Sequence, residues 1–266
     1  MPRVTPVAAA NAVAAGIVLA FVGWVCSMPG PGAAAEAVPA GYLAVAPAPD
    51  GASAPAAGMR EGAAAEAAPT ASHGRTATLL DPGWVESTAG LTGIPSRALQ
   101  AYAAAGVVVQ RERPDCHLGW NTLAAIGFVE SAHATHGNGE LAADGYSTAP
   151  IIGPALNGDG YAAIRDSDAG EFDGDRQWDR AVGPLQFIPE TWRQFGRDGD
   201  GNGVADPQQI DDAALAAAGY LCEAGGNLGE GPGWTRAVYA YNNSRSYAED
   251  VRAKAIEYAA RAAAAG

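Results

Sequence analysis

The chain has 266 residues, 48% hydrophobic and 17% charged, which is enough for one ordinary domain plus a low-complexity segment but not for two large domains. Its 29 acidic residues outnumber the 16 basic ones and give a net charge of −13, which argues against a nucleic-acid-binding protein. The three cysteines form no Cys-x-x-Cys pair, which argues against a structural zinc site.

Residues 1–35 have the features of an export segment. One basic residue, Arg3, precedes an apolar run over residues 12–26, and the small residues 33–35 offer a signal-peptidase site. An uncleaved membrane anchor is the alternative, because the apolar stretch reaches about 20 residues when residues 7–10 are included. Both interpretations export the rest of the chain.

Residues 36–78 consist mainly of Ala, Pro and Gly and contain few large apolar side chains. Such a segment cannot bury enough surface to offset the entropy of ordering it, so we expect a disordered linker. The linker acts either as a tether that gives the domain reach or as a passive spacer.

Residues 79–266 are expected to form one mainly α domain, because helical spacing of apolar residues dominates this part. The first expected helix opens at Pro95 and carries Leu99 and Tyr102 on one face. The others are marked by Leu123 with Ile126, by Pro189 with Gly196 as its end, by Leu215 to Cys222 with Gly225-Gly226 as its end, by Trp234 with Val238 and Tyr241, and by a capping box of Ser246 and Glu249.

Cys116 and Cys222 are the only cysteines of this domain. Because an exported domain meets an oxidising environment, we expect them to form a disulfide bond. Two buried free thiols are the alternative.

Glu130 is the candidate catalytic residue. In a helix, Leu123, Ile126 and Glu130 share one narrow face, so the carboxyl lies beside apolar side chains near the negative end of the helix dipole. Both effects raise the pKa of a carboxyl, and a carboxylic acid that stays protonated near neutral pH is what a glycosidic oxygen requires as a general acid. The alternative is an exposed glutamate at a helix end.

Three ordered motifs resemble a known family. Residues 181–192 contain Gly183-x-x-Gln186-Phe-x-Pro, Tyr241-Asn242 follows, and Glu130-Ser131 precedes. Together they resemble the lytic murein transglycosylases, near the membrane-bound B type, over residues 94–259. The resemblance implies a lysozyme-like SLT domain.

The resemblance also implies a reaction on peptidoglycan, the cell-wall glycan. Glu130 would be the sole acid and base, cleaving the bond between N-acetylmuramic acid and N-acetylglucosamine and leaving a 1,6-anhydro end, with no second carboxylate. Gln186 and Ser131 would bind substrate, Tyr241 would orient Glu130, and Asn242 would support the site.

Two segments depart from the family or lack periodicity. Ala132 to Gly137 follow Glu130-Ser131 where a short Phe-Gly or His-Gly is expected; His133 and His136 suggest a metal, but we interpret them as surface residues. Residues 132–181 are rich in Gly, Asp and Asn and are expected to form the rim of a sugar cleft. The aromatic residues of this segment either stack on sugars or hold the loop in place; they are Tyr146, Tyr161, Phe172 and Trp178. The nearest candidates for a second carboxylate are Asp173 and Asp175.

Residues 198–212 predict a structural calcium site of EF-hand type. Oxygen ligands fall at positions 1, 3 and 5, a glycine lies at 6 and a backbone carbonyl at 7. Position 12 is Gln209, which cannot give a bidentate carboxylate, whereas the B-type enzymes resembled here use a fifteen-residue loop that would close on Asp212. The expected ligands are Asp198, Asp200, Asn202, Val204 and Asp212. The alternative is an acidic turn that caps the next helix.

Two other functions remain compatible with the sequence. One is a muramidase that hydrolyses the same bond with water. The other is a non-catalytic, calcium-stabilised module that binds the cell wall. In each case the expected partner is peptidoglycan outside the cytoplasm.

Overall fold

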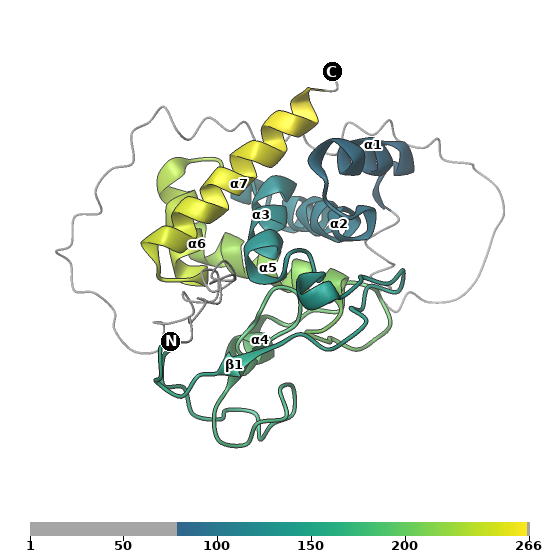
Figure 1. Cartoon of the computed structure of the whole chain (residues 1–266). Coiled ribbons are helices and arrows are strands. Elements are labelled where there is room, and N and C mark those ends of the chain that lie inside the picture. The colour runs from purple at the N-terminus through teal and green to yellow at the C-terminus, as the bar shows by residue number, and fades with distance from the viewer. Residues whose placement is uncertain (1–78, 265–266) are drawn as a thin grey trace, which may run out of the picture.

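The computed structural model describes residues 79–264, so the predicted export segment (1–35) and linker (36–78) lie outside the described residues. Within residues 79–264 the fold is mainly helical, as predicted, with one short antiparallel strand pair (Figure 1). No helix in this part of the chain has both the length and the apolar character of a membrane span. The elements are α1 (Pro82–Thr92), α2 (Ser96–Glu112), α3 (Trp120–Ser131), β1 (Ile152–Ala155), β2 (Arg180–Val182), α4 (Pro189–Phe195), α5 (Ile210–Gly225), α6 (Gly231–Tyr241) and α7 (Arg245–Ala263).

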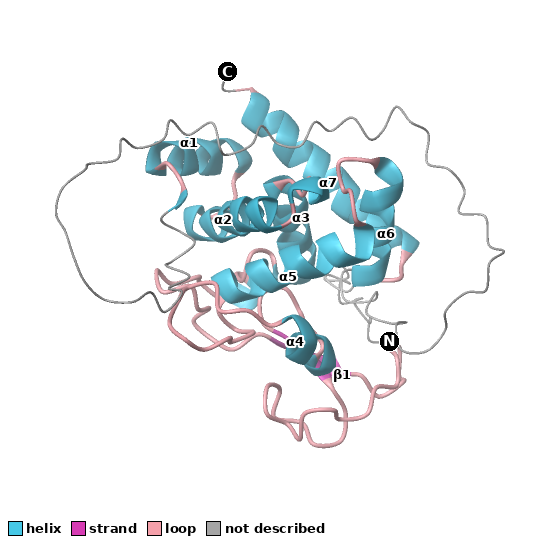
Figure 2. Ribbon diagram, turned by 180° about the vertical axis from the view of Figure 1, so that it is seen from behind, coloured by secondary structure: helices cyan, strands magenta, loops and turns pink. Residues whose placement is uncertain are grey.

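The helices form one body, and a loop-rich part lies against one side of it. Helix α2 packs on α5 and α3, α3 lies along α7, and α5 contacts α6. The view from behind shows that most of the chain between α3 and α5 is loop and carries the strand pair and α4 (Figure 2). The C-terminal end of α3 therefore lies where the two parts meet, since Ser131 is hydrogen-bonded to Pro184.

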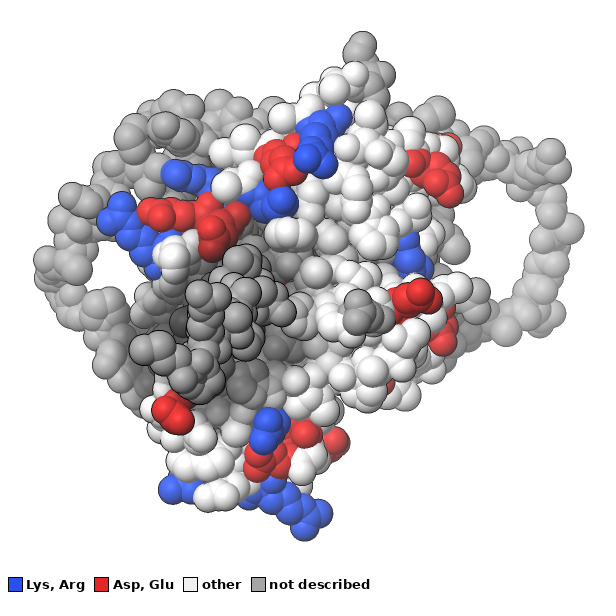
Figure 3. Space-filling view, viewed as in Figure 1, with Lys and Arg blue, Asp and Glu red and all other residues white. Residues whose placement is uncertain are grey.

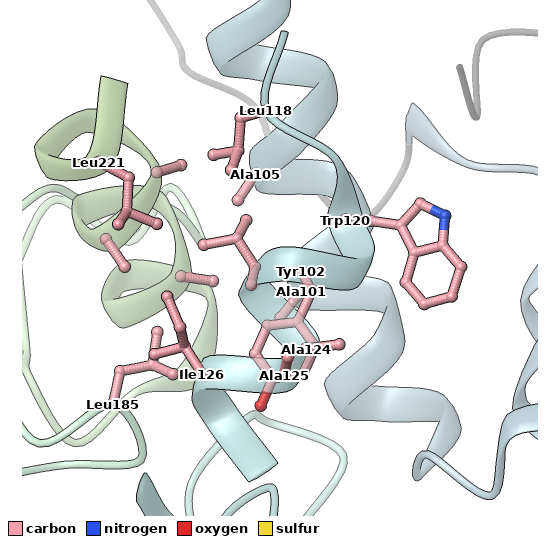
Figure 4. Packing of buried hydrophobic residues seen from close by; sticks show 14 of the residues in the cluster. Ala101, Tyr102, Ala105, Leu118, Trp120, Ala124, Ala125, Ile126, Leu185 and Leu221 are labelled. Atoms are coloured by element: carbon pink, nitrogen blue, oxygen red, sulfur yellow. The ribbon is translucent and has the colours of Figure 1, made fainter. Parts of the chain in front are cut away.

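Small side chains let the central helices approach closely. Ala101 of α2 and Ala125 of α3 are fully buried, together with Ile126 (Figure 4). Tyr102 is also fully buried, and a Cβ atom at residue 127 would lie 2.1 Å from its hydroxyl oxygen. Only glycine fits at Gly127, one turn before Glu130, so the α2–α3 contact depends on this residue.

The helix ends follow the predicted signals with two exceptions. The cap of α7 is Ser244, whose hydroxyl accepts a hydrogen bond from the Tyr247 amide, so the predicted capping box at Ser246 and Glu249 is wrong. Helix α1 was not predicted, although Asp81 caps it by accepting a hydrogen bond from the Trp84 amide at 2.8 Å. The other expected helices are confirmed as α2 to α6.

The predicted disulfide bond between Cys116 and Cys222 is confirmed, with a Cα–Cα distance of 5.4 Å. It connects the 3₁₀ turn that precedes α3 to the last turns of α5. The cross-link therefore ties the segment before α3 to α5, a helix of the core.

Candidate active site

The three predicted motifs meet at the turn of residues 183–187. The backbone of Val182 and Phe187 exchanges two hydrogen bonds, which closes the turn. Three successive carbonyl oxygens of the turn then accept hydrogen bonds from the motif side chains. Gln186 Nε2 donates to Gly183 at 2.9 Å, Ser131 Oγ to Pro184 at 2.7 Å, and Tyr241 Oη to Leu185 at 2.7 Å. The turn thus joins the ends of α3 and α6.

The backbone of this turn requires unusual conformations. Gly183 has φ +76°, and a Cβ atom there would lie 1.7 Å from the Pro207 carbonyl oxygen. Gln186 has φ +49°, a left-handed value that a non-glycine residue rarely adopts. Its buried side chain is held on one side by Gly183, and its Oε1 atom faces Gly153. The role of Gln186 in substrate binding stays a prediction.

Glu130, the last residue but one of α3, lies beside this turn and is partly buried. Burial raises the pKa of its carboxyl to about 8, and a hydrogen bond from Tyr247 partly opposes the rise. The carboxyl is therefore mainly protonated at neutral pH, which is the state that a general acid needs. The alternative of a freely exposed glutamate at the helix end does not agree with this environment.

Tyr247, at the start of α7, holds the Glu130 carboxyl. Its hydroxyl donates a hydrogen bond to Glu130 Oε1 at 2.5 Å. The family resemblance implied this orienting role for Tyr241, whose hydroxyl donates to the Leu185 carbonyl oxygen. Burial and then the charge of Glu130 raise the pKa of Tyr241 well above its ordinary value, so Tyr241 still lies close to the Glu130 carboxyl. Tyr247 lies in the last expected helix, and no sequence motif pointed to this contact.

The Ser131 side chain is engaged by hydrogen bonds within the protein. Its side chain is 2% exposed, donates to Pro184, and accepts a hydrogen bond from the Ala134 amide at 2.8 Å. The hydroxyl is therefore engaged on both sides and holds the turn, and the role of Ser131 in substrate binding stays a prediction.

Asn242 follows Tyr241 at the end of α6 and is 4% exposed. Neither polar atom of its side chain has a hydrogen-bond partner among the described residues. An unsatisfied buried amide is costly, so this side chain is an open position for a polar group. Its predicted supporting role at the site remains a prediction.

The residues after Ser131 form a left-handed turn of Ala132, His133 and Ala134, with φ values of 52°, 62° and 67°. For residues other than glycine this conformation costs roughly 1–2 kcal/mol each. His133 is 4% exposed and hydrogen-bonded to two tyrosines, so its interpretation as a surface residue is wrong. His136 is exposed, as predicted.

The loop-rich part gives its aspartates and aromatic residues mostly internal partners. Asp173 accepts the Arg180 amide at 2.7 Å, and Asp175 forms an ion pair with the Arg180 side chain at 2.9 Å. Both carboxylates are thus engaged in holding the loop before β2. Of the aromatics, Tyr146 donates to Asp206 at 3.1 Å, Phe172 packs against the core, Trp178 stacks with Arg165 at 4.0 Å, and Tyr161 is half-buried.

The carboxylates of the predicted calcium loop converge. Asp198, Asp200 and Asp212 each offer an oxygen atom, and these atoms lie within 4.8 Å of one another. Burial raises the pKa of Asp212 to about 6, so its charged form carries a cost that a cation would offset. The side chain of Gln209 instead caps α5, accepting the amides of Asp211 and Asp212. Gln209 is therefore engaged in capping the helix, and the closure of a calcium loop by Asp212 stays a prediction.

The fold and this arrangement define a helical protein with a shielded carboxyl beside a rigid, motif-bearing turn. Residues 163–238 match the family model described as Transglycosylase SLT domain, so the predicted resemblance to the lytic transglycosylases is borne out over this segment. The matched segment contains the 183–187 turn and the 198–212 loop, whereas Glu130 precedes it and Tyr241 and Asn242 follow it. No curated protein and no solved structure matches the chain. An SLT domain indicates action on peptidoglycan and hence a place in the cell envelope.

Replacing Tyr247 by Phe is expected to raise the pKa of Glu130 further. The hydrogen bond from Tyr247 stabilises the charged carboxylate, and the variant lacks it. Because a hydrogen bond to a charged group contributes about 1.5–3 kcal/mol, the pKa of Glu130 should rise by roughly one unit or more. The alkaline limb of a pH–rate profile should therefore move to higher pH. Tyr239→Phe, on the preceding helix, is the control, and an unmoved limb in Tyr247→Phe would contradict the assignment.

Proposed function

We propose that this protein is a peptidoglycan lytic transglycosylase in which Glu130 is the only acid and base. The observation that carries the proposal is the shielded Glu130 carboxyl, whose pKa is raised to about 8, beside a turn gripped by the Ser131, Gln186 and Tyr241 side chains. An acid of this strength keeps its proton at neutral pH and can still release it to a leaving oxygen.

The proposed reaction has two proton transfers at one carboxyl. Glu130 first gives its proton to the glycosidic oxygen as the bond from that oxygen to the muramyl C1 atom breaks. The resulting carboxylate then takes the proton of the C6 hydroxyl while O6 bonds to C1. The product is a 1,6-anhydro end, no water is consumed, and Glu130 regains its proton. Because the nucleophile belongs to the sugar, orientation by the site supplies much of the acceleration.

The surroundings of Glu130 favour a single-carboxylate reaction over a two-carboxylate one. A glycosidase of the two-carboxylate type needs a second Asp or Glu flanking the same bond. The two aspartates considered for this role, Asp173 and Asp175, are engaged by the Arg180 amide and side chain. Tyr247 and Tyr241, which are not ionised at neutral pH, are the neighbours that interact with Glu130.

Substrate recognition is proposed to rest on hydrogen bonds and stacking rather than on long-range attraction. Charged side chains on the viewed face follow α7 and gather again on the loop-rich part, and the described surface between them is mainly uncharged (Figure 3). The net charge of −13 also has the same sign as the polyanionic wall. Asn242, whose buried amide is unsatisfied, and Gln186 are the proposed polar contacts.

Product analysis tests the proposal. Purified glycan strands digested with the wild-type protein and with Glu130→Gln are compared by mass spectrometry. Anhydro ends from the wild type alone support the transglycosylase. Reducing ends would instead identify a muramidase, and binding without cleavage would identify a non-catalytic module.

A structural calcium ion belongs to the same proposal. Asp198, Asp200 and Asp212, with Asn202 and the Val204 carbonyl, form the oxygen-rich donor set that calcium prefers. A bound ion would neutralise these carboxylates and fix the loop between α4 and α5, with no part in the chemistry at Glu130.

Calcium at about 100 times its dissociation constant is expected to raise the melting temperature by roughly 5–10 °C, since this excess contributes about 2.7 kcal/mol. Thermal melts with calcium or with chelator measure the rise. The variant Asp200→Ala should lose it, whereas Asp159→Ala, an exposed aspartate outside the loop, should keep it. An equal melting temperature with calcium and with chelator would remove the ion from the proposal.

A further inference from the structure

The left-handed turn of residues 132–134 directly follows the Glu130-Ser131 pair. Three successive non-glycine residues with φ between 52° and 67° do not persist unless their surroundings hold them. Two backbone hydrogen bonds return from this turn to α3, from Ala132 to Phe128 and from His133 to Gly127. The conformation of the turn and that of the last turn of α3 therefore depend on each other.

The His133 side chain is the main anchor of this turn. Its Nε2 atom lies 2.8 Å from the hydroxyl of Tyr258 on α7, and its Nδ1 atom lies 3.3 Å from the hydroxyl of Tyr102 on α2. Burial and the nearby Lys254 ammonium lower the pKa of His133 to about 4, so the imidazole is neutral at working pH. Lys254 is itself paired with Glu257. A neutral imidazole serves one hydroxyl as donor and the other as acceptor.

The same helix that receives His133 also supplies the partner of Glu130. Tyr247 and Tyr258 are both on α7, three turns apart and therefore on one face. Helices α3 and α7 pack along each other, with the Glu130–Tyr247 hydrogen bond at one point and the His133–Tyr258 hydrogen bond at another. A change at His133 alters the second point and hence the position of Glu130 relative to Tyr247.

We propose that His133 is a positioning residue, which holds the strained turn and the α3–α7 contact so that the Glu130 carboxyl stays against Tyr247. The proposal rests on the function proposed above. His133 acts through Glu130 and touches no substrate. Three consequences follow: its loss lowers kcat rather than raising KM, it changes the pKa of Glu130, and part of the loss returns when one ring-nitrogen contact is restored.

The test compares four substitutions of His133. His133→Phe fills the space without hydrogen bonds, and His133→Gly accepts the left-handed backbone without an anchor. His133→Gln replaces the Nε2 contact to Tyr258, and His133→Asn replaces the Nδ1 contact to Tyr102. We expect Phe and Gly to lower kcat on glycan strands on the order of tenfold to a hundredfold, with KM within about twofold, and Gln to recover most of the loss.

A second readout does not depend on activity. The Glu130 carboxyl carbon, assigned by its absence in Glu130→Gln, is titrated by NMR in the wild type and each His133 variant. His136→Phe, at the exposed histidine three residues on, is the matched control and should leave kcat and the titration unchanged.

The outcomes separate the two proposals. An unchanged Glu130 titration and wild-type kcat in folded His133→Gly and His133→Phe would overturn the positioning role. If His133→Phe does not fold, equal kcat and equal Glu130 titration in His133→Gly and His133→Gln would overturn it. A wild type that cleaves no glycan would overturn the proposed function, and the titration would still decide the role of His133.

Discussion

Replacing Glu130 by Gln is expected to lower the rate of glycan cleavage roughly 10²–10⁴-fold, the range that general acid–base catalysis supplies. The amide keeps the shape of the side chain and can still accept the hydrogen bond of Tyr247, but it has no proton to give. The loss should lie toward the upper end, because one residue performs both proton transfers. Reducing-end and anhydro-end assays on purified strands measure it.

Glu86→Gln, on the exposed surface of α1, is the control and should keep full activity. The pH–rate profile of the wild type adds a check, since the acid form is required and the rate should fall as pH rises through about 8. Full wall-clearing activity in Glu130→Gln would exclude Glu130 as the acid.

The raised pKa of Glu130 should also make the folded protein less stable as pH rises. The pKa of Glu130 is raised in the folded state from about 4.5 to about 8. Its contribution to stability is therefore fully present below about pH 4.5 and is lost as pH rises through 8. Glu130→Gln should lack this loss, so at alkaline pH the variant should melt higher, relative to wild type, than it does at pH 4.

Removing the disulfide bond is expected to have the largest effect on stability. The bond closes a loop with a sequence separation of 106 residues, worth about 4–5 kcal/mol in the chain-entropy model. For a domain of this size the melting temperature should fall by roughly 10–20 °C. Thermal melts of the double variant Cys116→Ser/Cys222→Ser against wild type measure the change.

Reductant supplies the matched control for this variant. Wild-type protein in reductant should melt near the double variant, and the double variant should not respond to reductant. A wild type that melts equally with and without reductant would show that the cross-link contributes little.

The sequence predicts best what depends on local pattern. Leu99 with Tyr102 and Leu123 with Ile126 repeat at helical spacing, and both helices are where the spacing puts them. The helical spacing that places Leu123 and Ile126 on a buried face also predicted a shielded Glu130, because neighbours on one face share an environment. Asp81-Pro82 carried the same kind of local signal for α1.

Features that depend on distant contacts were not predictable. His133 lies in a polar stretch, and only the approach of α2 and α7 buries it between Tyr102 and Tyr258. Tyr247 likewise reaches Glu130 across 117 positions of sequence. Buried tyrosine hydroxyls need partners, so several tyrosines on one helix face indicate that polar partners exist without identifying them. The β1–β2 pair was missed because both strands are too short for alternation to register.

The grip on the 183–187 turn has a consequence for how this protein can vary. Ser131 and Tyr241 donate hydrogen bonds to the backbone carbonyl oxygens of Pro184 and Leu185. Every amino acid carries such a carbonyl group. Substitutions at those two positions therefore leave the contact chemistry unaltered, provided the replacement fits. Gly183 has no such freedom, because any added side chain would meet the Pro207 carbonyl at 1.7 Å. Substitutions should therefore be tolerated at Pro184 and Leu185, which lie between the signature residues. They should be excluded at Gly183, the first signature residue.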